Sequence, residues 1–162
     1  MSFKLPEVDL RDEHLRLIGL VISEWARLES VLDLALWAFL GTTQRHGRAL
    51  TSQVSPRNRI PLLKEVASKS LRLDDYDTFV RMVDDAAHYL TERNCLAHAV
   101  WTLRDDGGSP YIGFAAITKP GAFEVEREPF KIPRMRKNAK NIRELTQKLM
   151  LFLERTTHAP PP

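Results

Sequence analysis

Arg93, Asn94 and His98 bring three chemically useful side chains into one short stretch of the chain. A histidine titrates near neutral pH and can accept or donate a proton, whereas a guanidinium can bind a phosphate group through two hydrogen bonds. An asparagine amide can orient either of these partners. The Arg-to-His spacing alone arises often by chance, but asparagine directly after the arginine makes the pattern rarer. These residues are therefore the candidates for phosphate chemistry without a metal ion.

The helix expected to carry these residues has an apolar stripe. It begins near Asp74 or Asp75, and its apolar residues recur at spacings of three, four and seven: Phe79, Val83, Ala86, Leu90, Ala97 and Trp101. The helical period places Arg93 and Asn94 about 50° to either side of the centre of this stripe, and His98 at its margin. The opposite, exposed side is predicted to hold Arg81, Asp84, Asp85, His88, Glu92 and Cys95. Polar side chains inside an apolar sector are expected at functional or paired sites.

The remaining helices follow from capping signals and apolar spacing. A long helix over residues 11–40 should end at Gly41, because glycine readily takes the left-handed conformation that closes a helix. Its few solvent-facing positions predict burial against the domain's own core and against a second surface, such as another subunit. Residues 42–55 are expected to form a loop and a short helix. Ser55 and Pro56 are an N-cap followed by proline for a helix to about Leu71, and a last amphipathic helix should start at Pro133.

The segment before the last helix has the pattern of β-structure. Residues 99–103 and 111–117 flank the turn-rich residues 105–110 and predict a β-hairpin, and residues 123–126 alternate and could add a third strand. The expected fold is therefore mainly α, a helical bundle with a small β-hairpin before the last helix. Residues 1–157 are expected to form one domain, and residues 158–162 a disordered tail.

Composition favours a cytoplasmic protein that does not cross a membrane. The single cysteine, Cys95, cannot form an intramolecular disulfide, and the first residues lack the apolar core of a signal peptide. The most apolar stretch, residues 15–40, is interrupted by Glu24, Arg27 and Glu29, whereas a membrane span needs about 20 uninterrupted apolar residues. The histidines and the cysteine show no zinc spacing, and no glycine-rich phosphate loop follows a strand, so neither a metal nor another cofactor is expected.

Basic side chains are concentrated in one part of a chain whose net charge is +3. Six cations, with no acidic residue among them, occupy the start of the last predicted helix: Lys131, Arg134, Arg136, Lys137, Lys140 and Arg143. A helix N-terminus already favours phosphate, so this basic run is the predicted RNA-contacting surface. A looser cluster is a second candidate, although charge runs are commonly only solvated faces: Arg45, Arg48, Arg57, Arg59 and Lys64.

Glu29 is a second polar residue in apolar surroundings. Its helical face also carries Ile18, Ile22, Leu36 and Leu40. A buried carboxylate needs a partner. Arg93 or His98 is one candidate, which would make Glu29 a supporting residue of the site, and an ion pair with any other arginine is the equal alternative.

With Arg93, Asn94 and His98, the sequence resembles the ribonuclease members of the HEPN superfamily (higher eukaryotes and prokaryotes nucleotide-binding), whose motif is an arginine, a neighbouring polar residue and a histidine a few residues on. The order of the predicted elements is also similar over most of the chain. The resemblance implies a helical bundle, a homodimer that brings two copies of the motif together, and metal-independent RNA cleavage in toxin–antitoxin or phage-defence settings, with an antitoxin protein as a candidate partner. A variant motif, in which a tyrosine two residues after the histidine is a target of nucleotide modification, is absent because Val100 stands there.

Helical geometry bears on how such a site would be assembled. Asn94 and His98 are one turn apart and share a face, whereas Arg93 and His98 differ by about 140° and would meet only across a two-fold interface. His98 would act as general base or acid and Arg93 would bind the phosphate, which gives a 2′,3′-cyclic phosphate and a 5′-hydroxyl. Two alternatives stay open. One is a non-catalytic module that binds nucleic acid, nucleotides or proteins through the same cleft; the other is a structural role in which the motif cross-links helices.

Overall fold

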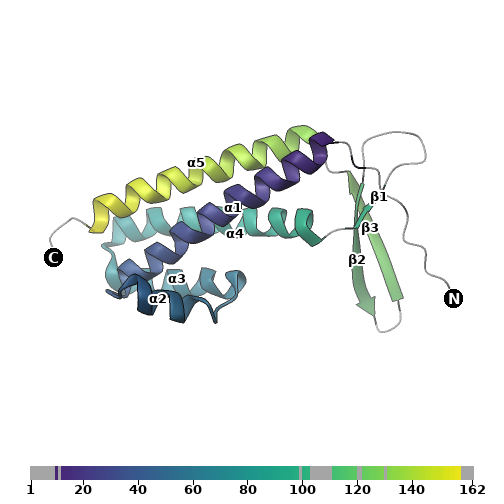
Figure 1. The fold of residues 1–162 in the computed structure, drawn as a ribbon. Helices are drawn as coiled ribbons and strands as arrows, with labels where there is room; N and C mark the ends of the chain where they lie inside the picture. The colour runs from purple at the N-terminus through teal and green to yellow at the C-terminus, as the bar shows by residue number, and fades with distance from the viewer. Residues whose placement is uncertain are drawn as a thin grey trace.

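The computed structural model describes residues 10, 12–98, 100–102, 111–119, 122–129 and 131–157 of the chain (Figure 1). The elements in chain order are α1 (Asp12–Phe39), α2 (Gln44–Thr51), α3 (Pro56–Ser70), α4 (Leu73–His98), β1 (Val100–Thr102), β2 (Tyr111–Lys119), β3 (Ala122–Pro129) and α5 (Ile132–Thr157). Helices account for most of the described residues and pack on one another. The predicted mainly helical bundle is therefore confirmed.

The long helices α1, α4 and α5 form the body of the bundle. α1 packs along α5 and against α4, and the shorter α3 packs against α1 and α4 (Figure 1). Apolar side chains spaced three or four residues apart on α1, including Leu17, Val21 and Leu28, are fully buried. The ring centroid of Phe79 on α4 lies 5.1 Å from that of Phe39 and 5.7 Å from that of Phe152. Aromatic packing therefore joins the three long helices.

Local sequence signals set several helix ends as predicted. Gly41 follows α1 with a φ of 61°, in the left-handed region. The side chain of Ser55 accepts a hydrogen bond from the backbone N–H of Asn58 at 3.4 Å, and Pro56 is the first residue of α3. These short-range contacts specify where α1 stops and where α3 starts.

The bounds of α4 differ from the prediction. The helix begins at Leu73, so Asp74 and Asp75 lie in its first turn and neither residue is the N-cap. Their negative charges there interact favourably with the helix dipole. It ends at His98, and Trp101 lies in β1. Towards this end Leu96 is buried and Ala97 is exposed. The predicted apolar stripe is therefore wrong at its C-terminal end, because the helix stops before Trp101.

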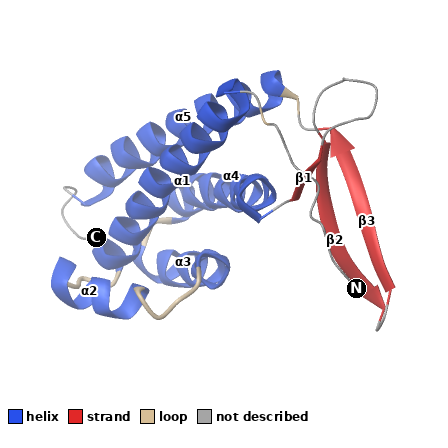
Figure 2. Cartoon of the chain, turned by 45° about the vertical axis from the view of Figure 1, so that its right-hand side comes forward, coloured by secondary structure: helices blue, strands red, loops and turns tan. Residues whose placement is uncertain are grey.

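Three antiparallel strands stand between α4 and α5, in the order β1-β2-β3. Val100 pairs with Gly113 and Ile112 pairs with Glu128, and the register shifts between Ile117 and Lys119. The sheet lies beyond the end of α4, at one end of the bundle (Figures 1 and 2). The sequence predicted a two-stranded hairpin here, with residues 123–126 as a candidate third strand, whereas β3 is eight residues long and pairs along most of β2.

None of the described helices combines the length and the apolar character needed to cross a membrane. The tail predicted at residues 158–162 lies outside the described residues.

Candidate functional site

Asn94 and His98 lie near the C-terminal end of α4, and both line a pocket between α3 and α4. The pocket has a volume of about 590 Å³. α3 contributes Arg57, Ile60 and Pro61 to its lining, and α4 contributes Ala87, Leu90, Thr91, Asn94, Cys95 and His98. Small-molecule sites commonly have this size, with apolar walls and a few polar groups. The pocket can therefore hold a ligand the size of a nucleotide.

The polar groups of this pocket suit an anion. Arg57, Asn94 and His98 are all exposed, and none of the described residues that line the pocket is acidic. A phosphate group that enters would meet a guanidinium, an amide and an imidazole with no competing carboxylate in the lining. The imidazole can also transfer a proton. The pocket thus has the residue types for phosphate binding and for acid–base chemistry.

Arg57 belongs to this pocket because of its place at the start of α3. Ser55 caps the helix, and Arg57 follows within the first turn. The free N–H groups and the dipole of a helix N-terminus add to the attraction of an anion. The sequence placed Arg57 in a loose basic cluster apart from the motif, and only the packing of α3 on α4 brings it to Asn94 and His98. No spacing along the chain predicted that Arg57 would line this pocket.

Arg93 does not line the pocket with Asn94 and His98. Its Nη1 donates a hydrogen bond to Oδ1 of Asn94 at 2.9 Å, and its Nε is buried without a hydrogen-bond partner among the described residues. Arg93 is half-buried, whereas Asn94 and His98 are exposed. The sequence placed Asn94 inside the apolar sector of the helix, and in the single chain this prediction is wrong because the Asn94 side chain is exposed. The bond from Arg93 orients the Asn94 amide and leaves the Asn94 NH2 group to donate.

Glu92 is buried, whereas the sequence predicted it on the exposed side of the helix. α5 covers this side of α4 and supplies the partners. Arg134 donates to both carboxylate oxygens, from Nη2 at 2.7 Å and from Nε at 3.1 Å, and Asn138 Nδ2 donates at 2.8 Å. Burial alone raises the pKa of Glu92, but the hydrogen bonds from Arg134 and Asn138 and the Arg134 charge outweigh burial and lower this pKa below its usual value. The network fixes the helical turn that carries Arg93.

The sequence of α5 contains a pattern from which this network could have been predicted. Arg134 and Asn138 are four residues apart, so they project from the same face of that helix, next to the buried Met135. A guanidinium and an amide at this spacing beside a core position indicate a buried acceptor on a neighbouring helix. Which helix supplies the acceptor follows only from the packing of α5 on α4.

Glu29 does not contact the motif, which corrects the prediction that Arg93 or His98 is its partner. Nη1 of Arg59 donates a hydrogen bond to Oε1 of Glu29 at 3.0 Å. The alternative, an ion pair with another arginine, is therefore confirmed. The reason is geometric: α3 packs against α1, and Arg59 in the first turn of α3 lies against the part of α1 that carries Glu29 and Asp33.

Arg59 ties α1 to the start of α3 through several bonds. Besides Glu29, Nη1 contacts Oδ1 of Asp33 at 3.0 Å, while Nε and Nη2 donate to the backbone carbonyls of Val54 and Thr51, each at 2.9 Å. Burial raises the pKa of Asp33, although the Arg59 charge opposes this effect, and the nearby Glu29 raises it further. The cluster holds the turn that carries Arg57. Glu29 thus supports the pocket from a distance, through α3.

The predicted RNA-contacting run lies on the first half of α5, and four of its six cations are paired within the chain. The pairs are Arg134 with Glu92, Arg136 with Glu13, Lys140 with Glu144 and Arg143 with Glu24. The Glu24 carboxylate is buried and accepts bonds from Nη2 and Nε of Arg143 at 2.7 and 3.0 Å. Lys131 and Lys137 are exposed and form no ion pair with a described residue. Much of the run therefore binds α5 to α1 and α4.

Among the described residues, no group of three or more histidine, cysteine, aspartate or glutamate side chains is placed to hold a metal ion. Comparisons with protein-family models, with curated proteins and with solved structures find no match for this chain. We therefore infer its function from the chemistry of the pocket between α3 and α4.

Proposed function

We propose that the chain is a metal-independent endoribonuclease of the HEPN type, which acts as a homodimer and cleaves RNA in the pocket between α3 and α4. The observation that carries the proposal is that Asn94, His98 and Arg57 line one open pocket without an acidic neighbour in its described lining. A proton-transfer group and an anion-binding group thereby share one cavity. The resemblance of residues 93–98 to the HEPN motif supports the same activity.

The chemistry needs only the RNA and these side chains. His98 accepts the proton of the ribose 2′-hydroxyl, and the 2′-oxygen attacks the adjacent phosphorus as the bond from phosphorus to the 5′-oxygen breaks. His98, protonated by this transfer, then donates the proton to the departing 5′-oxygen. Arg57 binds the non-bridging oxygens, on which negative charge grows in the transition state. The products are a 2′,3′-cyclic phosphate and a 5′-hydroxyl, and no atom or electron is needed from elsewhere.

The homodimer completes the site in this proposal. Within one chain, Arg93 is directed to Asn94 and lies outside the lining of the pocket. A two-fold axis beside the C-terminal end of α4 would place Arg93 of one chain next to His98 of the other. Arg93 would then bind the same phosphate as Arg57.

Cleavage of an unstructured RNA in the presence of EDTA tests the activity. We expect His98→Ala to lower kcat by about 10²–10⁴-fold, because it removes the proton-transfer group, and Arg57→Ala to lower kcat/KM by about 10²-fold. His88→Ala is the matched control, since His88 is exposed on the same helix and does not line the pocket. Full activity of His98→Ala would contradict the proposal. RNA binding without turnover in the wild type, weakened by salt, would assign the non-catalytic alternative.

Mixing two inactive variants tests the shared site. If Arg93 and His98 act across the two-fold axis, an equimolar mixture of Arg93→Ala and His98→Ala chains forms mixed dimers with one intact site each, and about a quarter of the wild-type activity returns. If both residues act within one chain, no intact site forms and the mixture stays inactive. Single-turnover cleavage after subunit exchange measures the difference.

A further inference from the structure

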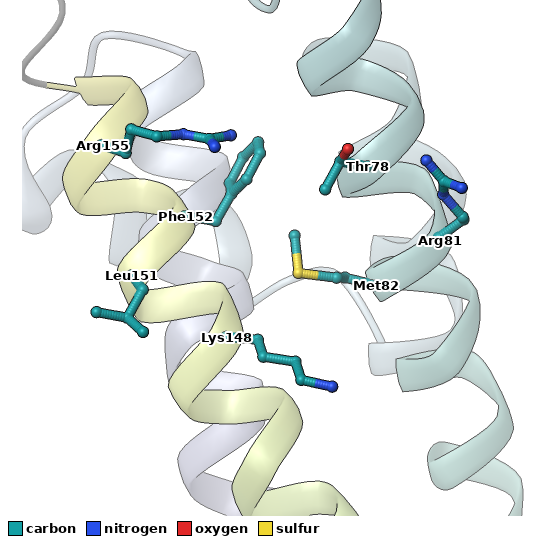
Figure 3. A pocket seen from close by; sticks show the side chains of 7 residues that line it. All are labelled: Thr78, Arg81, Met82, Lys148, Leu151, Phe152 and Arg155. Atoms are coloured by element: carbon teal, nitrogen blue, oxygen red, sulfur yellow. The ribbon is translucent and has the colours of Figure 1, made fainter.

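A second pocket lies between α4 and α5, away from the motif. It has a volume of about 520 Å³ and is lined by the side chains shown in Figure 3. Met82 of α4 and Leu151 and Phe152 of α5 form its apolar floor, and Arg81, Lys148 and Arg155 stand around it. Met82 and Asn94 are separated by about 18 Å along the axis of α4, from the rise of an α-helix. This pocket is therefore distinct from the proposed cleavage site.

The floor of this pocket is elongated and rigid. Lys148, Leu151, Phe152 and Arg155 occur at spacings of three, four and seven, so they follow one face of α5 for about 10 Å. Phe152 is held from behind by the ring of Phe79, with centroids 5.7 Å apart and an interplanar angle of 28°. Leu151, near the C-terminal end of α5, is 65% exposed and adds open apolar surface beside Phe152. An apolar ligand laid along α5 would cover it.

Two of the three cations around the floor form no ion pair within the part of the chain that the structure describes. Arg155 contacts Asp75 at 2.6 Å and lies over the Phe152 ring, 5.4 Å from its centroid. Arg81 donates from Nε to the backbone carbonyl of Asp77 at 3.2 Å, but its charge is not paired with a described carboxylate. Lys148 likewise forms no ion pair with a described residue, and Figure 3 shows its side chain extending from α5 towards α4. The pocket therefore combines an apolar floor with two cations that form no ion pair with a described residue.

We infer that this pocket binds a small amphipathic anion, with an aliphatic chain along the floor and a carboxylate or phosphate head between Arg81 and Lys148. A base or another flat aromatic group fits less well, because Phe79 and Arg155 already contact the Phe152 ring. The hydroxyl of Thr78, which also lines the pocket, donates to the backbone carbonyl of Asp74 at 3.0 Å, so it offers no free donor to a base edge. The apolar floor excludes water from an aliphatic chain, and the cations select the charge of the head.

Titration with dodecanoate below its critical micelle concentration tests the inference. Calorimetry and the NMR chemical shifts of the α4 and α5 amides measure the binding. We expect saturable one-to-one binding, with shifts centred on residues 78–82 and 148–155. Dodecyl phosphate distinguishes the head group: tighter binding than dodecanoate assigns a phosphate head and weaker binding a carboxylate. Acetate, which has the head alone, and dodecyltrimethylammonium, which has the chain with the opposite charge, should not bind.

Variants at exposed positions locate the site without disturbing the core. Arg81→Gln combined with Lys148→Gln should weaken dodecanoate binding at least about tenfold, because the head group no longer has two charged donors. Arg16→Gln combined with Arg48→Gln removes the same charge from exposed positions elsewhere and should leave the affinity unchanged. Equal affinity in both double variants would overturn the inference, as would equal binding of the alkylammonium. Binding only to phosphatidylglycerol vesicles would assign the pocket to a membrane surface and overturn the inference. A Leu151→Asp change that converts a dimer to a monomer would assign the pocket to a second copy of the chain and overturn it as well.

Discussion

Glu92 shows how one residue can position a site without touching its ligand. Its carboxylate is buried between α4 and α5 and accepts hydrogen bonds from Arg134 and Asn138. Removing one partner of a buried charge pair leaves the other partner uncompensated, which costs more than the pair contributes in net stability. Because Glu92 precedes Arg93, any loosening of this network also loosens the motif turn.

Glu92→Gln should lower the free energy of unfolding by about 2 kcal/mol at neutral pH, a value reduced from that of a fully buried pair because Arg134 is 37% exposed. The pKa of Glu92 in the folded state lies below its ordinary value of 4.5, so the stabilisation is fully present above 4.5. It is lost as the pH falls from 4.5 through the folded-state pKa. The difference between wild type and variant should therefore shrink in acid, as measured by urea unfolding over a pH series.

The control for this measurement is Glu65→Gln on α3. Glu65 forms an exposed pair with Lys69, one turn away, and should change stability little at any pH. A Glu92→Gln difference that stays constant or grows as the pH falls would contradict the buried network as its source.

At the scale of elements, the docking of α2 on α1 depends on the absence of a side chain at Gly47. A Cβ built at this position would lie 2.4 Å from Cδ1 and Cγ of Trp37, which is far inside van der Waals contact. Trp37 is itself buried, so its ring has little room to move. This close approach of the Gly47 backbone to the Trp37 ring therefore limits how α2 can dock on α1.

Gly47→Ala should destabilise the fold by about 1–3 kcal/mol, because the clash outweighs the better helix propensity of alanine. Gly19→Ala on α1 is the matched control. A Cβ there meets no atom within 4 Å, so the same substitution should stabilise the protein by about 0.5–1 kcal/mol. Thermal unfolding of the two variants under identical conditions measures the opposite signs. A stabilising Gly47→Ala would show that α2 is not held closely against Trp37.

At the scale of the whole molecule, the cations that are adjacent in the sequence do not form one exposed basic surface, because several of them are paired with carboxylates of other helices. The basic run on α5 forms three ion pairs with two other helices, with Glu13 and Glu24 on α1 and with Glu92 on α4. Lys131 and Lys137 remain exposed. The chain has a net charge of +3. Fewer cations of this run are therefore available to bind a polyanion than its composition suggests.

Lys131→Gln combined with Lys137→Gln should weaken RNA binding and reduce the slope of log K against log salt by about 0.7 for each phosphate that is no longer neutralised. Arg143→Gln should leave this slope nearly unchanged and lower stability instead, because Arg143 holds the buried Glu24. Fluorescence anisotropy with a labelled single-stranded RNA at several salt concentrations measures the slopes. Equal slopes for the wild type and the double variant would show that these lysines do not contact the RNA.

Short-range features of the chain were predictable because their physical causes are local. The ends of α1 and α3 follow from Gly41, Ser55 and Pro56, whose conformational preferences act within one turn. The common face of Asn94 and His98 follows from the helical period alone, and the pocket that both residues line agrees with it. The end of α4 was less predictable, because the apolar pattern continues to Trp101 although the helix stops at His98.

By itself, the sequence determined the helical bundle and the side-by-side placement of Asn94 and His98, since periodicity and capping depend on neighbours in the chain. Only the tertiary structure decided which side chains come together: Glu29 with Arg59, Glu92 with Arg134, and Arg57 in one pocket with Asn94 and His98. Several arginines could satisfy each carboxylate equally well on chemical grounds. The choice among them is made by the packing of α3 and α5 on α4 and α1, which depends on the fit of whole helix faces and not on the spacing of any residue pair.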